Sequence, residues 1–164
     1  MKITYLTAIA VLMFCTIMPV RAADDTGVQR LAICRDSWVD WQKGDPERMQ
    51  KFATYFRANY IPHNNDPYWL PKSDTAILGL HVSQVFPESI GMAVGFSVTV
   101  DARFDKTRAA LEKAVGKRLQ HCEASDDMKT CDLELAPQRI VTIMAEDSPK
   151  AAQTLVGCYY FYEK

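Results

Sequence analysis

The sequence lacks the local patterns that identify the common enzyme classes. No glycine-rich phosphate loop follows a predicted strand. The stretch Gly95–Thr99 lacks the second glycine of a nucleophile elbow and is typical of an ordinary strand. Carboxylate pairs such as Asp126 and Asp127 fall in predicted turns or on outer faces, whereas paired catalytic carboxylates need a cleft. The sequence therefore predicts a protein that is not an enzyme.

Metal-binding patterns are also missing. The chain has no C-x-x-C pair and only three histidines, which are His63, His81 and His121. His63 and Asp66 have an H-x-x-D spacing that can touch a cation, but two ligands do not complete a metal site. We therefore expect neither a metal ion nor any other cofactor.

Long runs of like charge are absent from the chain as well. Without Lys2 and Arg21, which lie in a predicted leader, 17 basic and 20 acidic residues remain, a net charge near −3. A nucleic-acid partner or an anionic membrane surface requires a concentrated basic face. The composition therefore argues against both of these partners.

The first 22 residues have the features of a secretory signal peptide. Lys2 supplies a positive start, residues 6–18 form an apolar run, and small residues precede a cleavage site after Ala22. A membrane anchor is the alternative, but it needs roughly 20 apolar residues, and this run is shorter. We expect residues 1–22 to be removed, which leaves residues 23–164 as one periplasmic or secreted domain.

Four cysteines remain after the leader, and an even number behind an export signal indicates two disulfides. Cys122 and Cys131 flank a predicted turn, so we expect them to bridge two adjacent strands. That leaves Cys34 and Cys158 to join the first helix to the last strand. Because bonded residues of neighbouring antiparallel strands must be direct partners, the first bridge also predicts a register, with Gln120 opposite Leu133 and His121 opposite Asp132.

Hydrophobic periodicity predicts the secondary structure. The predicted helices are 28–43, 46–60 and 103–115, and the predicted strands are 77–84, 92–100, 118–123, 130–136, 139–145 and 154–163. This order indicates an α+β fold: a mostly antiparallel sheet of about six strands, with an N-terminal helical hairpin and one further helix packed on it, stapled by two disulfides. The last strand is apolar in both of its alternating sets, which is typical of a central strand covered on both sides.

Residues 62–74 contain three prolines and two asparagines, which exclude a helix and a central strand. We predict a loop without regular structure, and loops of this length are often functional. The large side chains at its tip either fold down over the core or remain exposed for a partner, and the sequence leaves both alternatives open. The candidate partner-binding residues are His63, Asn65, Asp66, Tyr68, Trp69 and Leu70.

In its size, leader, disulfides and lack of catalytic patterns, the chain resembles the small exported inhibitors and immunity proteins of Gram-negative bacteria. The resemblance is one of general character and implies a protein partner, a toxin or a hydrolase, that is bound and neutralised in the periplasm. The alternative is a carrier of an apolar small molecule, held in a cavity between helices and sheet. That cavity would be lined by Trp38, Trp41, Phe52, Phe56, Tyr160 and Tyr162.

Overall fold

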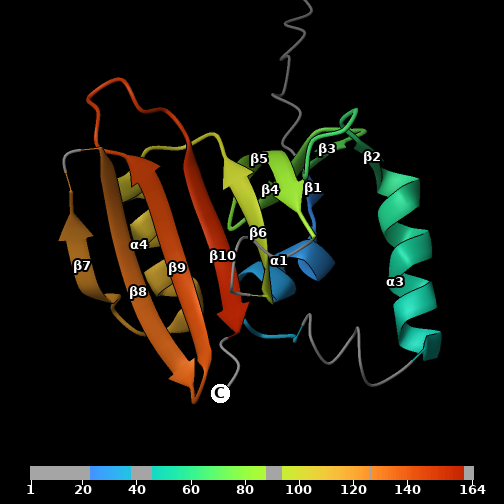
Figure 1. Cartoon of the computed structure of the whole chain (residues 1–164), viewed down its shortest axis with the longest axis horizontal. Coiled ribbons are helices and arrows are strands. Elements are labelled where there is room, and N and C mark those ends of the chain that lie inside the picture. Colours follow the sequence, from blue (N-terminus) through green and yellow to red (C-terminus); the bar gives the residue numbers. More distant parts are fainter. Residues whose placement is uncertain (1–22, 38–45, 88–93, 126, 161–164) are drawn as a thin grey trace, which may run out of the picture.

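The computed structural model describes residues 23–37, 46–87, 94–125 and 127–160, and its main feature is one large sheet with helices against one side (Figure 1). The predicted signal peptide lies outside these residues. Within them the helices are α1 (Thr26–Ala32), α3 (Pro46–Asn59) and α4 (Phe104–Val115). The strands are β1 (Ala23–Asp24), β2 (Tyr60–Pro62), β3 (Trp69–Pro71), β4 (Thr75–Ile77), β5 (Leu80–Phe86), β6 (Val94–Val100), β7 (Gln120–Ala124), β8 (Met128–Ala136), β9 (Arg139–Glu146) and β10 (Thr154–Tyr160).

The sheet is larger than predicted, and it is mixed. Its ten strands, counted over the described residues, follow the order β1-β4-β5-β6-β10-β9-β8-β7, with β2 and β3 attached beside β5. All neighbours are antiparallel except β1 and β4, which run parallel. The prediction of an α+β fold with two disulfides is confirmed, whereas the prediction of about six antiparallel strands is wrong. The additional strands are two or three residues long, too short to produce an alternating pattern.

The first helix is shorter than its periodicity predicts. It ends at Ala32, and Cys34 adopts a left-handed backbone conformation with φ of 59°. The amide N–H groups of Arg35 and Asp36 then donate to the carbonyl of Arg30, which closes a turn. Because a residue at positive φ cannot continue a right-handed helix, the helix stops before Cys34. Residues 38–43 of the predicted helix 28–43 lie outside the described residues.

The second and third helices follow the prediction closely. α3 starts at Pro46, as expected of proline in the first helical turn. α4 ends at Val115, and the next residue, Gly116, takes the left-handed conformation and donates its N–H to the carbonyl of Glu112. Arg103 occupies the N-cap position of α4 without a side-chain hydrogen bond.

The last strand holds the centre of the sheet. β10 pairs with β6 on one side and β9 on the other, so its predicted central position is confirmed. Cys158 is fully buried and is bonded to Cys34, while Cys122 is bonded to Cys131, as predicted. Cys158 faces α1, which packs against β6 and β10, and α4 lies against β9 (Figure 1).

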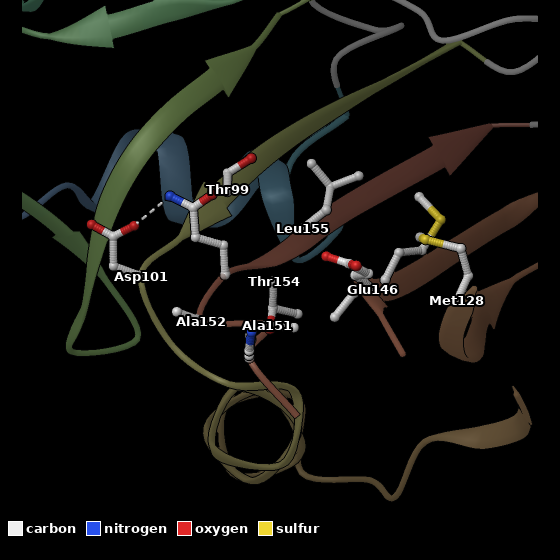
Figure 2. Close-up of a pocket in the computed structure, with 12 residues that line it drawn as sticks. Thr99, Asp101, Met128, Glu146, Ala151, Ala152, Thr154 and Leu155 are labelled. Carbon is white, nitrogen blue, oxygen red and sulfur yellow. Dashed lines mark hydrogen bonds between the residues drawn. The ribbon is translucent and has the colours of Figure 1, made fainter. Parts of the chain in front are cut away.

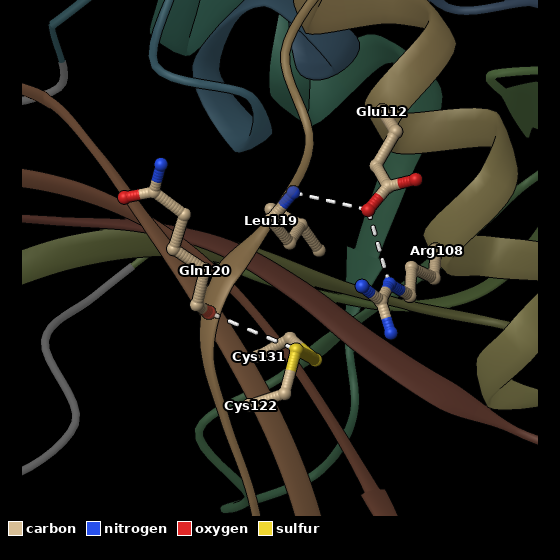
Figure 3. The surroundings of a disulfide bond; sticks show 6 residues. All are labelled: Arg108, Glu112, Leu119, Gln120, Cys122 and Cys131. Atoms are coloured by element: carbon tan, nitrogen blue, oxygen red, sulfur yellow. Dashed lines mark hydrogen bonds and ion pairs between the residues drawn. A yellow bond between two sulfur atoms is a disulfide. The ribbon is translucent and has the colours of Figure 1, made fainter.

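The register of the β7–β8 hairpin departs from the prediction at one residue. Cys122 lies opposite Cys131, but Gln120 lies opposite Asp132 instead of Leu133. A bulge at His121, where φ is 43°, takes up the extra residue, so the predicted pair of His121 with Asp132 is also wrong. Beside this bridge the Leu119 N–H donates to Glu112, and so does Arg108, which ties the start of the hairpin to α4 (Figure 3).

The N-terminal end of the described chain is fixed by a buried carboxylate. Asp25 is 8% exposed and caps α1, because its Oδ1 accepts the N–H of Val28 at 3.0 Å. Its Oδ2 accepts the hydroxyls of Tyr55 and Tyr60, both at 2.5 Å. Burial, followed by the hydrogen bond and charge of Asp25, holds the pKa of both tyrosines well above the ordinary value. Asp25 thereby connects the first helix to α3 and β2.

Candidate functional site

The sheet has one face that carries no helix among the described residues. We call it the open face, and it is the side of β6, β10, β9 and β8 turned away from Cys158 (Figure 1). Register places three rows of side chains across it, strand by strand. The rows are Asp132, Thr142, Gly157 and Ser97; Thr130, Met144, Leu155 and Thr99; and Glu134, Ile140, Tyr159 and Gly95.

A groove of about 640 Å³ lies on this open face (Figure 2). Leu155, Met144 and Thr99 form part of its floor, and the segment 150–153 between β9 and β10 forms a wall. Met128, 40% exposed, lies near Glu146 at one end of the groove. The groove therefore combines an apolar floor with polar and charged groups at its ends.

At the other end of the groove, Asp101 takes part in a network of exposed polar groups. Its Oδ1 accepts Nε2 of Gln153 at 2.8 Å, and its Oδ2 lies 2.6 Å from Nδ1 of His81. The other ring nitrogen of His81 lies 3.3 Å from Asp74. Burial would raise the pKa of Asp101, but the contacts with Gln153 and His81 outweigh it and lower this pKa. The network holds Asp101 ionised at the mouth of the groove.

Tyr159 lies across the middle of the open face. A Cβ at Gly95 would come within 2.7 Å of its ring, and a Cβ at Gly157 within 2.8 Å. The two glycines therefore leave the space that the ring fills, and Tyr159 is only 8% exposed. The last strand is thus covered on this side by its own aromatic side chain, whereas the sequence predicted covering elements on both sides.

Two buried polar atoms on the open face have no hydrogen bond of ordinary geometry. They are Oδ1 of Asp132 and the hydroxyl of Tyr159. Burial raises the pKa of Tyr159; the adjacent Ser97 hydroxyl opposes this, and the charge of Asp132 adds to it. Burial also raises the pKa of Asp132, against the opposing charge of His121. Buried polar atoms without partners are uncommon and costly, so they mark these two neighbouring rows of the open face as a candidate site.

Replacing Asp132 with Asn is expected to increase stability at neutral pH, because burial disfavours the ionised carboxylate in the folded state. A folded-state pKa raised above the unfolded value stabilises the fold at low pH, and this stabilisation is lost as pH rises through the folded pKa. Urea unfolding at a series of pH values should show the difference between Asp132→Asn and wild type growing from acidic to neutral pH. A difference that does not change with pH would contradict this assignment.

The predicted partner-binding loop forms a short hairpin, with β2 paired to β3 and Trp69 opposite Val85 of β5. Trp69 and Leu70 are half-buried, and the Trp69 ring lies 4.9 Å from that of Phe56. Tyr68, also half-buried, stacks on His63 at 4.8 Å. Asn65 and Asp66 are exposed, and Asp66 lies 2.8 Å from Nδ1 of His63. The exposed tip is therefore polar, while the aromatic side chains turn toward the protein.

Replacing Trp69 with Ala is expected to lower the stability by about 2 kcal/mol and the melting temperature by several degrees, because contact with Phe56 would be lost. Asn65→Ala is the matched change at the exposed tip of the same hairpin and should leave the melting temperature within about one degree of wild type. Thermal unfolding followed by circular dichroism measures both variants. Equal melting temperatures for Trp69→Ala and Asn65→Ala would show that the contact contributes nothing.

The cavity predicted between helices and sheet is filled where the structure describes its residues. Phe52 and Phe56 are buried and stack at 5.5 Å, and Phe52 meets Phe96 edge to face at 6.3 Å. Tyr160 is half-buried and donates to the carbonyl of Asp36 at 3.2 Å. The other predicted lining residues, Trp38, Trp41 and Tyr162, lie outside the described residues.

The sequence contained one signal for the open face. In the predicted strand 92–100, the alternating set with Gly95, Ser97 and Thr99 is small and polar, which is typical of a strand that buries only its other face. The position of Asp132 beside this set could not be inferred, because β8 and β6 are separated in the sheet by β10 and β9. The groove depends on this strand order, because its floor comes from β6, β10 and β9.

In the described part of the chain, no cluster of three or more His, Cys, Asp or Glu side chains could hold a metal ion. The same residues contain no helix of the length and apolarity needed to cross a membrane. Comparisons with protein families, with curated proteins and with solved structures each found no match to this chain.

Proposed function

We propose that this is a non-enzymatic, exported binding protein that acts in the periplasm. We further propose that it is an inhibitor or immunity-type protein, which binds and neutralises a toxin or hydrolase of that compartment. The observation that carries it is the groove on the open face, presented by the central strands of the sheet. Strands hold side chains in fixed positions, so a partner meets a preorganised surface.

The disulfides support this reading. Cys34–Cys158 ties the start of the fold to β10, which contributes Leu155 to the groove. Disulfides persist in oxidising compartments such as the periplasm. The mixed lining of the groove also suits a protein partner, because such interfaces combine an apolar centre with a polar rim.

A carrier of an apolar small molecule is the second candidate, and the size of the groove is the observation that favours it. A volume of about 640 Å³ lies in the range of small-molecule sites. The carboxylate of Glu146 at one end favours the protein partner instead, because an apolar ligand would leave it without compensation.

The test is affinity capture with residues 23–164 as bait, against periplasmic extract and purified products of neighbouring genes. Each captured hydrolase or toxin is then assayed with increasing amounts of the protein. Stoichiometric loss of its activity supports the proposal. Failure of every captured enzyme to be inhibited, together with a lipid or pigment found by native mass spectrometry, would replace it with the carrier function.

A further inference from the structure

With the exception of Lys150 in the groove wall, the charged residues described on the open face are acidic. Register places Glu134 and Glu146 there together with Asp132, and Glu123 joins them from β7, opposite Thr130. The basic residues of these strands lie on the other side: Lys129 shares the side of Cys131, and Arg139 lies over the ring of Tyr160. Lys150, in the wall of the groove, is the basic residue among those that line it.

Several acidic residues of the protein have a basic partner: Asp36 pairs with Arg30, Glu112 with Arg108 and Asp147 with Lys129. No ion pair involves Glu123, Asp132, Glu134 or Glu146 within the part of the chain that the structure describes. The charge of Glu123 repels that of Asp132: burial raises the pKa of Asp132, the charge of His121 opposes this, and Glu123 adds to it. A cation placed on this face would relieve that repulsion.

Two buried oxygens without hydrogen bonds lie on the same face of the sheet. The Tyr159 hydroxyl belongs to a side chain that is 8% exposed, and Oδ1 of Asp132 is buried without a hydrogen bond. Burial raises the pKa of Tyr159, and the charge of Asp132 adds to this effect. Neither residue lines the groove, so they mark a neighbouring part of the open face, where a hydrogen-bond donor of a partner would satisfy both oxygens.

The groove fits the remainder of a basic side chain. Arginine and lysine carry apolar stems that lie along apolar surfaces while the charged end reaches a polar group. Met144 and Leu155 supply such a surface, and Glu146 supplies a carboxylate at the end. An arginine or lysine stem lying on Met144 and Leu155 would therefore place its charge beside Glu146, which forms no ion pair among the described residues.

We infer that the open face is the docking surface for a protein partner with a basic surface, one arginine or lysine of which occupies the groove with its charge beside Glu146. This inference rests on the proposed function and specifies the chemistry of its partner. Acidic side chains on a preformed sheet attract and orient such a partner, and the attraction weakens as salt screens it.

The first test uses a defined probe and requires no partner. ¹⁵N-labelled residues 23–164 are titrated with the peptide acetyl-Gly-Arg-Gly-amide, and separately with the same peptide carrying citrulline, which has a similar shape without the charge. We expect amide shifts that cluster in β8, β9 and β10 with the arginine peptide, and much smaller ones with citrulline. Shifts scattered over the chain, or equal for both peptides, would overturn the inference.

The second test uses variants with an inhibited partner obtained as described above. Glu146→Lys is expected to weaken binding by about tenfold or more, and the wild-type affinity should fall as salt increases. Asp105→Lys is the matched control, an exposed acid on α4 at the opposite side of the sheet. Equal affinities of the two variants would reject this docking surface while leaving the proposed function intact. Clustered peptide shifts without any captured partner would retain the surface and reject the function.

Discussion

Removing the Cys34–Cys158 disulfide, by replacing both cysteines with alanine, is expected to destabilise the folded protein by about 5 kcal/mol. The bond closes a loop with a sequence separation of 124 residues, so its loss greatly increases the freedom of the unfolded chain. The effect should be seen by urea unfolding under non-reducing conditions. With a typical total stability of about 5–15 kcal/mol, a large fraction of this variant is expected to be unfolded near body temperature.

The second disulfide is the internal control for this prediction. Cys122 and Cys131 are only nine residues apart, so the same chain-entropy argument gives about 2.7 kcal/mol for the double alanine variant. Cys122 is exposed at the edge strand β7, whereas Cys131 is buried, so the variant also loses the packing of one cysteine side chain. Similar losses for both variants would show that loop length does not govern the contribution of these bonds.

Replacing Asp25 with Ala is expected to destabilise the protein by about 3 kcal/mol, the second largest effect. The change removes the cap of α1, a loss of about 1 kcal/mol, and the acceptor of two tyrosine hydroxyls. Tyr60 is 1% exposed, so its hydroxyl would remain buried without a partner. Urea unfolding of the variant measures the total loss.

Two variants separate the contributions at this position. Asp24→Ala changes the adjacent exposed carboxylate and should cost less than about 0.5 kcal/mol. Asp25→Asn keeps an acceptor for the helix cap but removes the charge that holds the tyrosine hydroxyls, so its loss should lie between the other two. A loss in Asp25→Ala as small as that in Asp24→Ala would mean that the three contacts contribute little.

Both of these predictions concern contacts that connect the N-terminal part of the fold to other elements. Asp25 lies three residues beyond the predicted cleavage site and ties α1 to α3 and β2. Cys34 then ties the residues after α1 to the central strand. Both connections support the sheet on the side opposite the open face. A binding partner on the open face would therefore meet a surface whose shape is maintained from behind.

The proposed docking surface also makes sense of an unfavourable feature of the fold. Unpaired carboxylates and unpartnered buried atoms reduce stability, and the Asp132→Asn variant is expected to recover part of it. Residues that are kept for binding often lower the stability of a folded protein in this way. The same substitution should therefore improve stability, which the urea experiment measures, whereas Glu146→Lys tests the arginine contact.

Local sequence patterns determined several elements of this protein. The predicted helices 46–60 and 103–115 are bounded by Pro46 and Gly116, because one has a suitable fixed φ and the other readily takes positive φ. The two-sided hydrophobicity of 154–163 indicated the central strand, and cysteine positions relative to the predicted elements indicated both disulfides. All of these depend on neighbours in the chain, which a sequence displays directly.

Tertiary structure decided the remainder. Hydrogen bonds and packing with distant segments decide three features. These are the end of α1 before Cys34, the bulge at His121, and the short strands β2, β3 and β4. The open face likewise joins Asp132, Gly157 and Ser97 from strands that are adjacent only in the sheet. The sequence by itself determined which residues could form strands and bridges, whereas the order of the strands decided which carboxylates share a face, because side chains from non-neighbouring segments meet only after the sheet has formed.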